Sequence, residues 1–333
     1  MPLLPLAIPF GVSSLQQPIK IGTRGSPLAL AQAEDVKAKL IAAQADLSDA
    51  AIEIVVIKTS GDRILDRHLM NAGGKGLFTK EIEEALLAGD IDCAVHSSKD
   101  MPTKLPEGLC LSVFLPREDP RDAFISQKFS HFQDLPRGAI LGTASLRRRA
   151  QALRLRPDLK VVTFRGNVQT RLKKLKGGEA DATFLALAGL NRLSMASAAT
   201  ERLPLADFLP APAQGAVTVE TREADESMAK LLLPLHCEKT ALEVTAERAF
   251  LAALDGSCRT PIAAHAATQG DTLMMHAQLL SLDGTQVFER HESSAITLEA
   301  ASLMGTQLGN EIRDEAGPDF FVKLAREVEA EIV

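Results

Sequence analysis

The chain has 333 residues, of which 46% are hydrophobic and 24% charged, and its formal net charge is −6. This length exceeds what one hydrophobic core normally supports, so we expect two or three domains. No apolar stretch reaches the ~18 residues that a membrane-spanning helix requires, which argues against a membrane partner.

Charge is unevenly distributed along the chain. The segment from Arg117 to Lys176 holds fifteen Lys and Arg against five Asp and Glu, and the remainder holds 22 basic and 38 acidic residues. Such a basic block in an acidic chain indicates a partner that carries several negative charges.

The first seventeen residues contain no Lys or Arg. They therefore lack the basic start of a secretory signal and the Arg-rich character of a transit peptide. We expect residues 1–18 to be a disordered leader and the protein to be cytoplasmic.

Alternating strand and helix patterns then predict an α/β first domain. Ser26 and Pro27 are typical of an N-cap followed by a first-turn proline, which begin a helix. The predicted strands span residues 19–22, 52–57 and 92–95, the predicted helices span 28–43 and 79–87, and a Gly-rich loop spans 59–76.

Two short segments of this domain carry candidate chemistry. Lys75 is followed by Gly76, whereas a phosphate-binding P-loop requires Ser or Thr there, so the pattern disfavours ATP hydrolysis. Lys99 and Asp100 follow a predicted strand, where an acid beside a base can transfer a proton. A neighbouring Lys-Asp pair is more often a surface feature, and the residues alone leave both interpretations open.

A second α/β unit is predicted over residues 122–209. Ser145 is placed as the N-cap of a helix, so Arg147, Arg148 and Arg149 lie in its first turn. The helix dipole is positive at that end, which disfavours three cations unless an anion lies among them.

Arg165 and Arg171 flank a turn after a predicted strand at residues 160–164. Two βα turns would thus present arginines at the carboxyl edge of a parallel sheet, where ligands usually bind. The planar guanidinium suits carboxylate or phosphate. A solvated basic helix or a nucleic-acid surface is the alternative, but the absence of Trp and Tyr leaves little to stack on bases, so we predict no nucleic-acid partner.

The segment 210–215 breaks the pattern and precedes a predicted strand at 216–220, a helix at 238–254, further strands and two closing helices. Cys258 lies in the loop that follows the helix at 238–254, beside Arg259, whose charge can favour the reactive thiolate. Taken alone, the residues slightly favour a structural cysteine. The four cysteines show no C-x-x-C spacing, so no metal site is predicted and reduced thiols are expected.

Eight blocks together resemble the porphobilinogen deaminase family, also called hydroxymethylbilane synthases. They occur in the family's order from about residue 19 to the C-terminal domain. The blocks are Gly22–Ala29, Thr59–Asp62, Gly73–Phe78, His96–Pro102, Arg117–Asp122, Leu146–Arg148, Arg165–Val168 with Arg171, and Gly256–Cys258.

The resemblance implies an α/β fold with two lobes like those of type II periplasmic binding proteins, plus a small C-terminal α/β domain. Domain 1 would comprise residues 19–115 and 216–235, domain 2 residues 116–215, and the cofactor-attachment domain residues 236–333. In this arrangement the strand near residue 216 returns to complete domain 1.

The resemblance also implies the activity. The family is a transferase that condenses four porphobilinogen molecules, with loss of ammonia, into the linear tetrapyrrole hydroxymethylbilane for heme and chlorophyll biosynthesis. Its cofactor is a dipyrromethane held by a thioether to a cysteine, which corresponds to Cys258, and its members are typically monomers.

Site residues follow from the matching positions. The catalytic aspartate corresponds to Asp100, and Ala144 stands where many members have a serine, so the hydroxyl contact is assigned to Ser145. Cofactor contacts are expected from Cys258, Arg24, Ser26, Lys99, Asp100, Ser145, Arg147, Arg148, Arg165 and Arg171, and substrate contacts from Arg24, Ser26, Arg165, Arg171 and Arg192.

Two rival functions fit part of the pattern. A two-lobed anion-binding module or ligand sensor explains the lobes and arginines but gives Cys258 no task. A lyase that forms a Schiff base through Lys99 explains the Lys-Asp pair but not the basic block.

Overall fold

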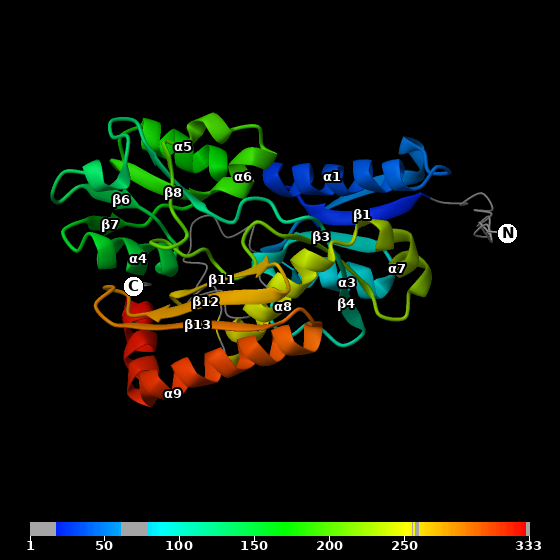
Figure 1. Cartoon of the computed structure of the whole chain (residues 1–333). Helices are drawn as coiled ribbons and strands as arrows, with labels where there is room; N and C mark the ends of the chain where they lie inside the picture. The colour runs from blue at the N-terminus through cyan, green and yellow to red at the C-terminus, as the bar shows by residue number, and fades with distance from the viewer. Residues whose placement is uncertain (1–17, 61–78, 255, 257–259, 331–333) are drawn as a thin grey trace.

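Three β-sheets organise the chain in a computed structural model that describes residues 18–60, 79–254, 256 and 260–330 (Figure 1). The predicted leader at 1–17, most of the Gly-rich loop, and Cys258 lie outside these residues. None of the helices within the described ranges is both long and apolar enough to cross a membrane.

The first lobe is a five-stranded sheet with helices on both faces. Its strand order is β2-β1-β3-β10-β4, in which β1 is parallel to β2 and β3, and β10 is antiparallel to β3 and β4. The strands are β1 (Ile19–Arg24), β2 (Ile52–Ile57), β3 (Cys93–Ser97), β4 (Leu109–Phe114) and β10 (Val217–Arg222). The helices are α1 (Pro27–Ala43), α3 (Lys80–Ala88) and α7 (Glu226–Leu232), with short 3-10 turns at Asp49–Ala51, Ser98–Asp100 and Leu233–Leu235.

Alternation along the strands supplies each face of this sheet with its own core, because successive side chains point to opposite sides. Ile21 and Val95 pack with Val36 and Leu40 of α1 on one face. Ala94 packs with Ile82 and Leu86 of α3 on the other face. Both faces are therefore buried, as expected for a largely parallel sheet.

The second lobe repeats this plan. Its strand order is β7-β6-β8-β5-β9, with β6 parallel to β7 and β8, and β5 antiparallel to β8 and β9. The strands are β5 (Asp122–Ser126), β6 (Ile140–Gly142), β7 (Lys160–Val162), β8 (Ala182–Ala186) and β9 (Glu201–Arg202). The helices are α4 (Leu146–Leu155), α5 (Val168–Lys176) and α6 (Leu187–Arg192), with short 3-10 turns at Phe132–Asp134 and Ala196–Ala198.

In both lobes the fourth strand is antiparallel and arrives from the other lobe. The chain leaves the first lobe after β4 and begins the second with β5, and it returns after β9 to form β10. Two crossing segments, 115–121 and 203–216, therefore connect the lobes. The two α/β lobes and the two crossings between them confirm the predicted fold class. The residue boundaries of the domains stay a prediction.

The C-terminal domain is an antiparallel sheet covered on one face by two long helices (Figure 1). Strands β11 (Ile262–Gln269), β12 (Thr272–Leu280) and β13 (Val287–Ala295) follow α8 (Glu238–Ala253), and α9 (Leu298–Ala330) closes the chain. Gly317 has a φ of 72°, a left-handed conformation that interrupts α9 just before Pro318. The two predicted closing helices are thus two segments joined at Gly317.

Helices α8 and α9 approach closely because glycines lie between them. A Cβ atom at Gly305 would lie 2.1 Å from the carbonyl oxygen of Ala246, a distance that no side chain tolerates. Phe250 of α8 and Ile312 of α9 pack together in the core of this domain. Leu146, the first residue of α4, joins the same core, so the C-terminal domain contacts the second lobe beside its arginine turn.

Candidate active site between the lobes

A small cavity of about 60 Å³ opens at the carboxyl end of the first sheet. Its lining brings together the end of β1, the start of α1 and the end of β3. Three predicted site residues, Arg24, Ser26 and Asp100, line it side by side. The sheet edge thus assembles residues that are 76 positions apart in the sequence.

The N-terminus of α1 forms one wall of this cavity. The Ser26 hydroxyl accepts a hydrogen bond from the backbone N–H of Ala29 at 3.3 Å, which confirms the predicted N-cap. One turn later the buried Gln32 exchanges hydrogen bonds of 2.9 and 3.1 Å with the hydroxyl of Ser97. This amide ties α1 to the strand that carries Asp100, a role that no sequence pattern indicated.

Lys99 and Asp100 lie in the 3-10 turn that follows β3, and Asp100 is exposed there. The Lys99 ammonium donates to the side-chain carbonyl of Gln214 at 3.3 Å. Burial lowers the pKa of Lys99 to about 8, against the opposing influence of Asp100. The lysine is thus a cation that loses its charge much more readily than a solvated one.

The arginines of α4 are buried around an internal carboxylate. Arg147 and Arg148 are 4% and 5% exposed, and their guanidinium nitrogens lie 2.7 and 2.6 Å from the two oxygens of Asp122. Burial opposes ionisation of Asp122, but the two guanidiniums outweigh it and hold the pKa of this carboxyl far below its usual range. Asp122 therefore places an anion among the arginines at the positive end of the helix dipole.

Gln214 connects this cluster to Lys99. Its side-chain N–H donates to the backbone carbonyl of Pro120 at 2.8 Å and to Asp122 at 3.0 Å. Gln214 lies in the returning crossing segment, whereas Asp122 begins the second lobe. A continuous polar chain therefore runs from Lys99 through Gln214 and Asp122 to the first turn of α4.

That first turn begins as predicted. The hydroxyl of Ser145 accepts from the backbone N–H of Arg148 at 3.4 Å, which confirms Ser145 as the N-cap. Arg147 also donates to the backbone carbonyl of Leu209, and Arg148 to that of Phe184 at 2.9 Å. The two guanidiniums are held rigidly, which favours recognition of a fixed ligand geometry.

Arg165 and Arg171 lie at the neighbouring turn between β7 and α5. The Nε of Arg171 donates to the carbonyl of Gly166 at 2.8 Å, and burial together with Arg148 lowers the pKa of Arg171 to about 10. The Nε of Arg165 is buried and has no hydrogen-bond partner among the described residues. Positive charge therefore accumulates at this edge without full internal compensation.

Arg192 is placed differently from the other predicted contacts. Its guanidinium donates to the carbonyl of Gly215 at 2.8 Å, and Asn191 beside it donates to Glu118 at 3.0 Å. Burial lowers the pKa of Arg192, and Glu118 partly offsets this effect. Both residues thus attach α6 to the two crossing segments.

A buried polar layer supports the cavity from behind. His96, which lines the cavity, lies 3.1 Å from Glu220, and both side chains are almost completely buried. Thr218 of β10 pairs with His96 of β3, which puts Glu220, two residues on, next to the imidazole. Burial raises the pKa of nearby Glu83, and Glu220 contributes to the rise. This layer fixes the end of β3, from which Asp100 projects.

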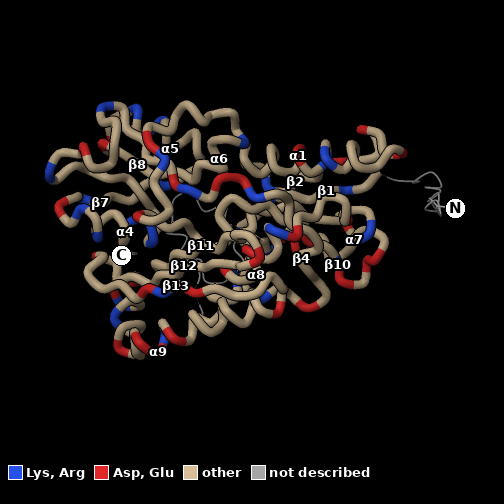
Figure 2. The backbone as a smooth tube through the Cα atoms, in the orientation of Figure 1, with Lys and Arg blue, Asp and Glu red and all other residues tan. Residues whose placement is uncertain are grey.

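The residues present fit an anionic ligand with several carboxylates. The Nε atoms of Arg147 and Arg165 are buried and lack hydrogen-bond partners among the described residues, and Lys99 is a half-buried cation. Figure 2 shows acidic residues over α9 and the region of α7, and acidic and basic residues together beside α6. Cys258 and Lys75, which the sequence also singled out, lie outside the described residues.

Thiols elsewhere in the described chain are free, as expected. Cys93, Cys110 and Cys237 form no disulfide. Cys93 is fully buried in β3, and burial raises its pKa to about 12. Cys110 and Cys237 are partly buried.

Comparison with known proteins agrees with the sequence pattern. A family model described as porphobilinogen deaminase, dipyromethane cofactor binding domain, matches residues 19–230, and one described as porphobilinogen deaminase, C-terminal domain, matches residues 241–314. Among solved structures, a periplasmic substrate-binding protein of an ABC transporter from Coxiella burnetii aligns with a TM-score of 0.40 and 15% identity, covering 65% of this chain and 91% of that one. A likeness at that level has no bearing on function.

Curated relatives align over almost their whole length. The porphobilinogen deaminase of Paracoccus denitrificans is 56% identical over 306 residues, which cover 92% of this chain and 97% of that protein. The porphobilinogen deaminase of Nitrobacter hamburgensis is 54% identical over 305 residues, which cover 92% and 96%. On these matches, the chain belongs to the porphobilinogen deaminase family.

Proposed function

We propose that the protein is a hydroxymethylbilane synthase, a transferase that joins four porphobilinogen molecules head to tail and releases ammonia at each addition. The observation that carries this proposal is the polar chain at the lobe interface. It links the Lys99-Asp100 turn of the first lobe to the arginine turns of the second through Gln214 and Asp122.

The arginine turns suit the substrate's chemistry. Every porphobilinogen ring bears an acetate and a propionate, so a growing chain adds carboxylates with each ring. Arg165 and Arg171 would donate paired hydrogen bonds to such groups, and Arg147 would use its remaining Nε. The fixed guanidiniums of α4 would orient a ring because Asp122 holds them in place.

The covalent cofactor belongs to the same proposal. A dipyrromethane attached through the sulfur of Cys258 would supply the pyrrole carbon to which the first porphobilinogen is joined. Its own carboxylates would lie against Lys99, Ser145, Arg147 and Arg148. Ser26 and Arg24, which line the cavity of the first lobe, would contact the incoming substrate.

Asp100 would perform the central chemical task. Loss of ammonia from porphobilinogen leaves an electron-poor, cationic ring, and the pyrrole N–H is a donor that needs an acceptor. An ionised carboxylate beside the cavity meets both demands, because it stabilises the cation and accepts the hydrogen bond. Removing one preorganised charge of this kind typically costs about 3 kcal/mol of transition-state stabilisation.

Lys99 would tune binding by its charge. A carboxylate that approaches this half-buried ammonium offsets the desolvation that depresses the lysine pKa. The cationic form is therefore favoured when ligand is bound. A monomeric state and a cytoplasmic location complete the proposal on the strength of the family resemblance and the leader composition.

Intact-mass spectrometry of the native protein tests the proposal directly. We expect an added mass of two pyrrole units on the purified protein, located by peptide mapping to Cys258. Cys258→Ser should carry no addition, whereas Cys237→Ser, which changes another free cysteine, should retain it. An unmodified mass on protein that still forms hydroxymethylbilane would refute the role of Cys258.

Acid-treated protein should also give a coloured product with an aldehyde reagent for pyrroles. An anion-binding module or a Schiff-base lyase would give no colour. A Schiff-base enzyme would instead be trapped at Lys99 by borohydride in the presence of substrate, and such trapping would overturn the assignment of Asp100.

A further inference from the structure

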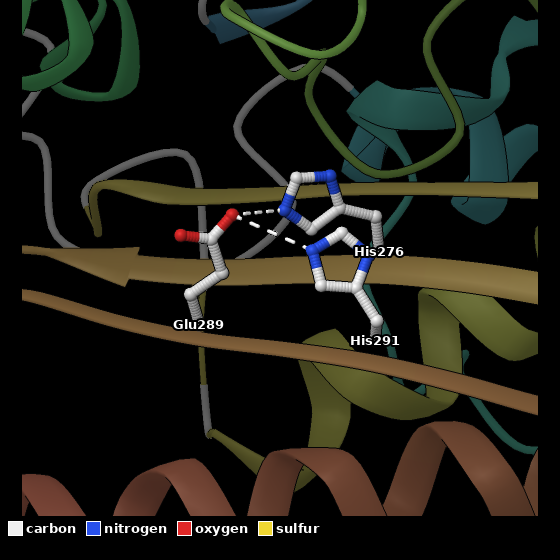
Figure 3. A group of neighbouring side chains, drawn as sticks. All are labelled: His276, Glu289 and His291. Carbon is white, nitrogen blue, oxygen red and sulfur yellow. Dashed lines mark hydrogen bonds and ion pairs between the residues drawn. The ribbon is translucent and has the colours of Figure 1, made fainter.

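Two histidines and a glutamate gather on one face of the C-terminal sheet, and none of them lines the cavity of the first lobe (Figure 3). His276 of β12 and His291 of β13 are direct cross-strand partners, and their rings stack with centroids 3.9 Å apart. Glu289 lies two residues before His291, so its side chain emerges on the same face. This face is opposite the one that packs on α8 and α9, because the alternate residues Met275 and Ala277 belong to the helix-facing core.

Three potential ligand atoms converge there. The Nε2 of His276 forms a hydrogen bond with Oε1 of Glu289, and the Nε2 of His291 lies 3.7 Å from the same oxygen. All three atoms lie within 4.8 Å of one another. Ligand atoms around a tetrahedral zinc ion are separated by about 3.4 Å, given bonds of about 2.0–2.1 Å, so small side-chain rotations would bring this set into coordination.

The glutamate is already oriented by two polar neighbours, Gln278 on the oxygen that would face the ion and Arg154 on the other oxygen. Gln278 donates to Oε1 of Glu289 at 2.9 Å, and Arg154 of α4 lies 3.7 Å from Oε2. Hydrogen-bonded partners of this kind fix a ligating carboxylate and are characteristic of metal sites. Arg154 would stay paired with Oε2, and Oε1 would face the two imidazoles.

We propose that His276, Glu289 and His291 bind one divalent first-row transition ion, with Zn²⁺ as the reference ion. Two imidazole nitrogens and one carboxylate oxygen are the donor set that such ions prefer over Mg²⁺ or Ca²⁺. The side chain of His291 is 66% exposed, so solvent can reach the site and water can complete the coordination. Neutral His276 would carry its proton on Nδ1 when Nε2 holds the ion.

The ion would connect the C-terminal domain to the second lobe. It would bridge β12 to β13, and through Arg154 on Oε2 of Glu289 it would include α4. Helix α4 begins at Leu146 and carries Arg147 and Arg148 in its first turn, more than one helical turn from Arg154. We therefore expect the ion to stabilise the contact between the C-terminal domain and the second lobe, independently of the chemistry at Asp100.

Calorimetric titration of the chelator-treated full-length protein with ZnCl₂ tests this site. The wild type should bind one ion with micromolar affinity and gain thermal stability. His291→Ala and Glu289→Gln should each weaken binding by at least tenfold and remove the gain in melting temperature. His291 is exposed, so its replacement leaves the fold intact and the readout interpretable.

A matched control is available on the second lobe. His131 is 62% exposed and lies 3.3 Å from Glu201, and this pair belongs to no cluster of three metal-ligating side chains within the described residues. His131→Ala should bind Zn²⁺ like the wild type. Binding of unchanged strength by His291→Ala and Glu289→Gln would show that the ion goes elsewhere, for instance to thiols, and would overturn the proposal. Failure of the wild type to bind at 100 µM would overturn it as well.

Cobalt gives an independent signature. Co²⁺ in a four-coordinate nitrogen and oxygen site has visible absorption bands that are far stronger than those of hexa-aquo Co²⁺. The wild type and His131→Ala should show these bands, and His291→Ala should not. Equal spectra for all three proteins would contradict the assigned ligands.

Discussion

The two lobes share one strand order but differ in the residues that form the first turn of the corresponding helices, α1 and α4. In each, a serine caps the helix that follows the second strand in the sheet order: Ser26 between β1 and α1, and Ser145 between β6 and α4. The first turn of α1 is apolar, whereas that of α4 carries buried arginines. One scaffold thus offers a cavity beside an exposed acid in the first lobe and a rigid cationic edge in the second.

The difference shows what it takes to bury cations at the positive end of a helix. The dipole and the low dielectric both disfavour Arg147 and Arg148, and Asp122 compensates from the antiparallel strand β5. The first turn of α1 has no buried arginines that need a compensating carboxylate. Asp100 at the carboxyl end of this sheet can therefore stay accessible. Four changes probe this contrast, from the largest expected effect to the smallest.

Replacing Asp122 should damage the second lobe most. Asp122→Asn leaves two buried guanidiniums without their carboxylate, and breaking a buried ion pair typically costs about 3–5 kcal/mol. Denaturant unfolding should show a loss of this size. Asp158→Asn is the matched control, because Asp158 pairs with Arg156 at 2.8 Å near the surface and its loss should be much smaller. Equal losses for the two variants would contradict the compensating role of Asp122.

Replacing Asp100 should damage chemistry and spare the fold. Asp100→Asn removes a charge from an exposed side chain, so the unfolding midpoint should stay near the wild-type value. Turnover should fall by about 10²–10³-fold, because the cationic ring loses its stabilising carboxylate. Intact mass should still show the added pyrroles. Near-normal turnover by this variant would sink the assignment.

The lowered pKa of Lys99 predicts that kcat/KM depends on pH. Its pKa of about 8 in the folded protein means that the cation is present below pH 8 and is lost as the pH rises through that value. kcat/KM for porphobilinogen should therefore decline above pH 8. Lys99→Arg keeps its charge and should lose this alkaline limb, and an unchanged profile would exclude Lys99 as its source.

The lowered pKa of Lys99 also makes the free energy of unfolding depend on pH. The unfolded chain retains the ordinary lysine pKa of 10.5 and so binds more protons than the folded chain between pH 8 and 10.5. The contribution of Lys99 to stability therefore rises with pH across that window. Comparing the unfolding free energies of wild type and Lys99→Met at pH 7 and pH 10 isolates this contribution.

The two helix caps should give the smallest effects. Ser26→Ala and Ser145→Ala each remove one hydrogen bond to a first-turn N–H, at a typical cost of about 1 kcal/mol. The losses should be similar in the two lobes, and threonine at either position should restore most of the stability. A loss several times larger at Ser145 would indicate that its hydroxyl also supports the buried arginines.

Local patterns determined the individual elements of this protein. The strand at 52–57 and the caps at Ser26 and Ser145 agree with the structure, because alternation and capping depend on neighbouring residues. The strand expected at 160–164 ends earlier, at Val162, because Phe164 turns into the core of the second lobe. The arginine turns could be predicted from the sequence as well, because they too are defined by neighbouring residues.

Tertiary structure alone decided which residues became partners. Asp122 lies 26 positions from Arg148, and its pairing depends on β5 entering the sheet beside β8. Gln32, Gln214 and Glu220 acquired roles in the same way. His276 and His291 meet only because the β12–β13 register sets them opposite each other. The sequence by itself therefore determined strands, helices and charged turns, whereas contacts between distant segments required the strand order and register that packing of the whole chain selects.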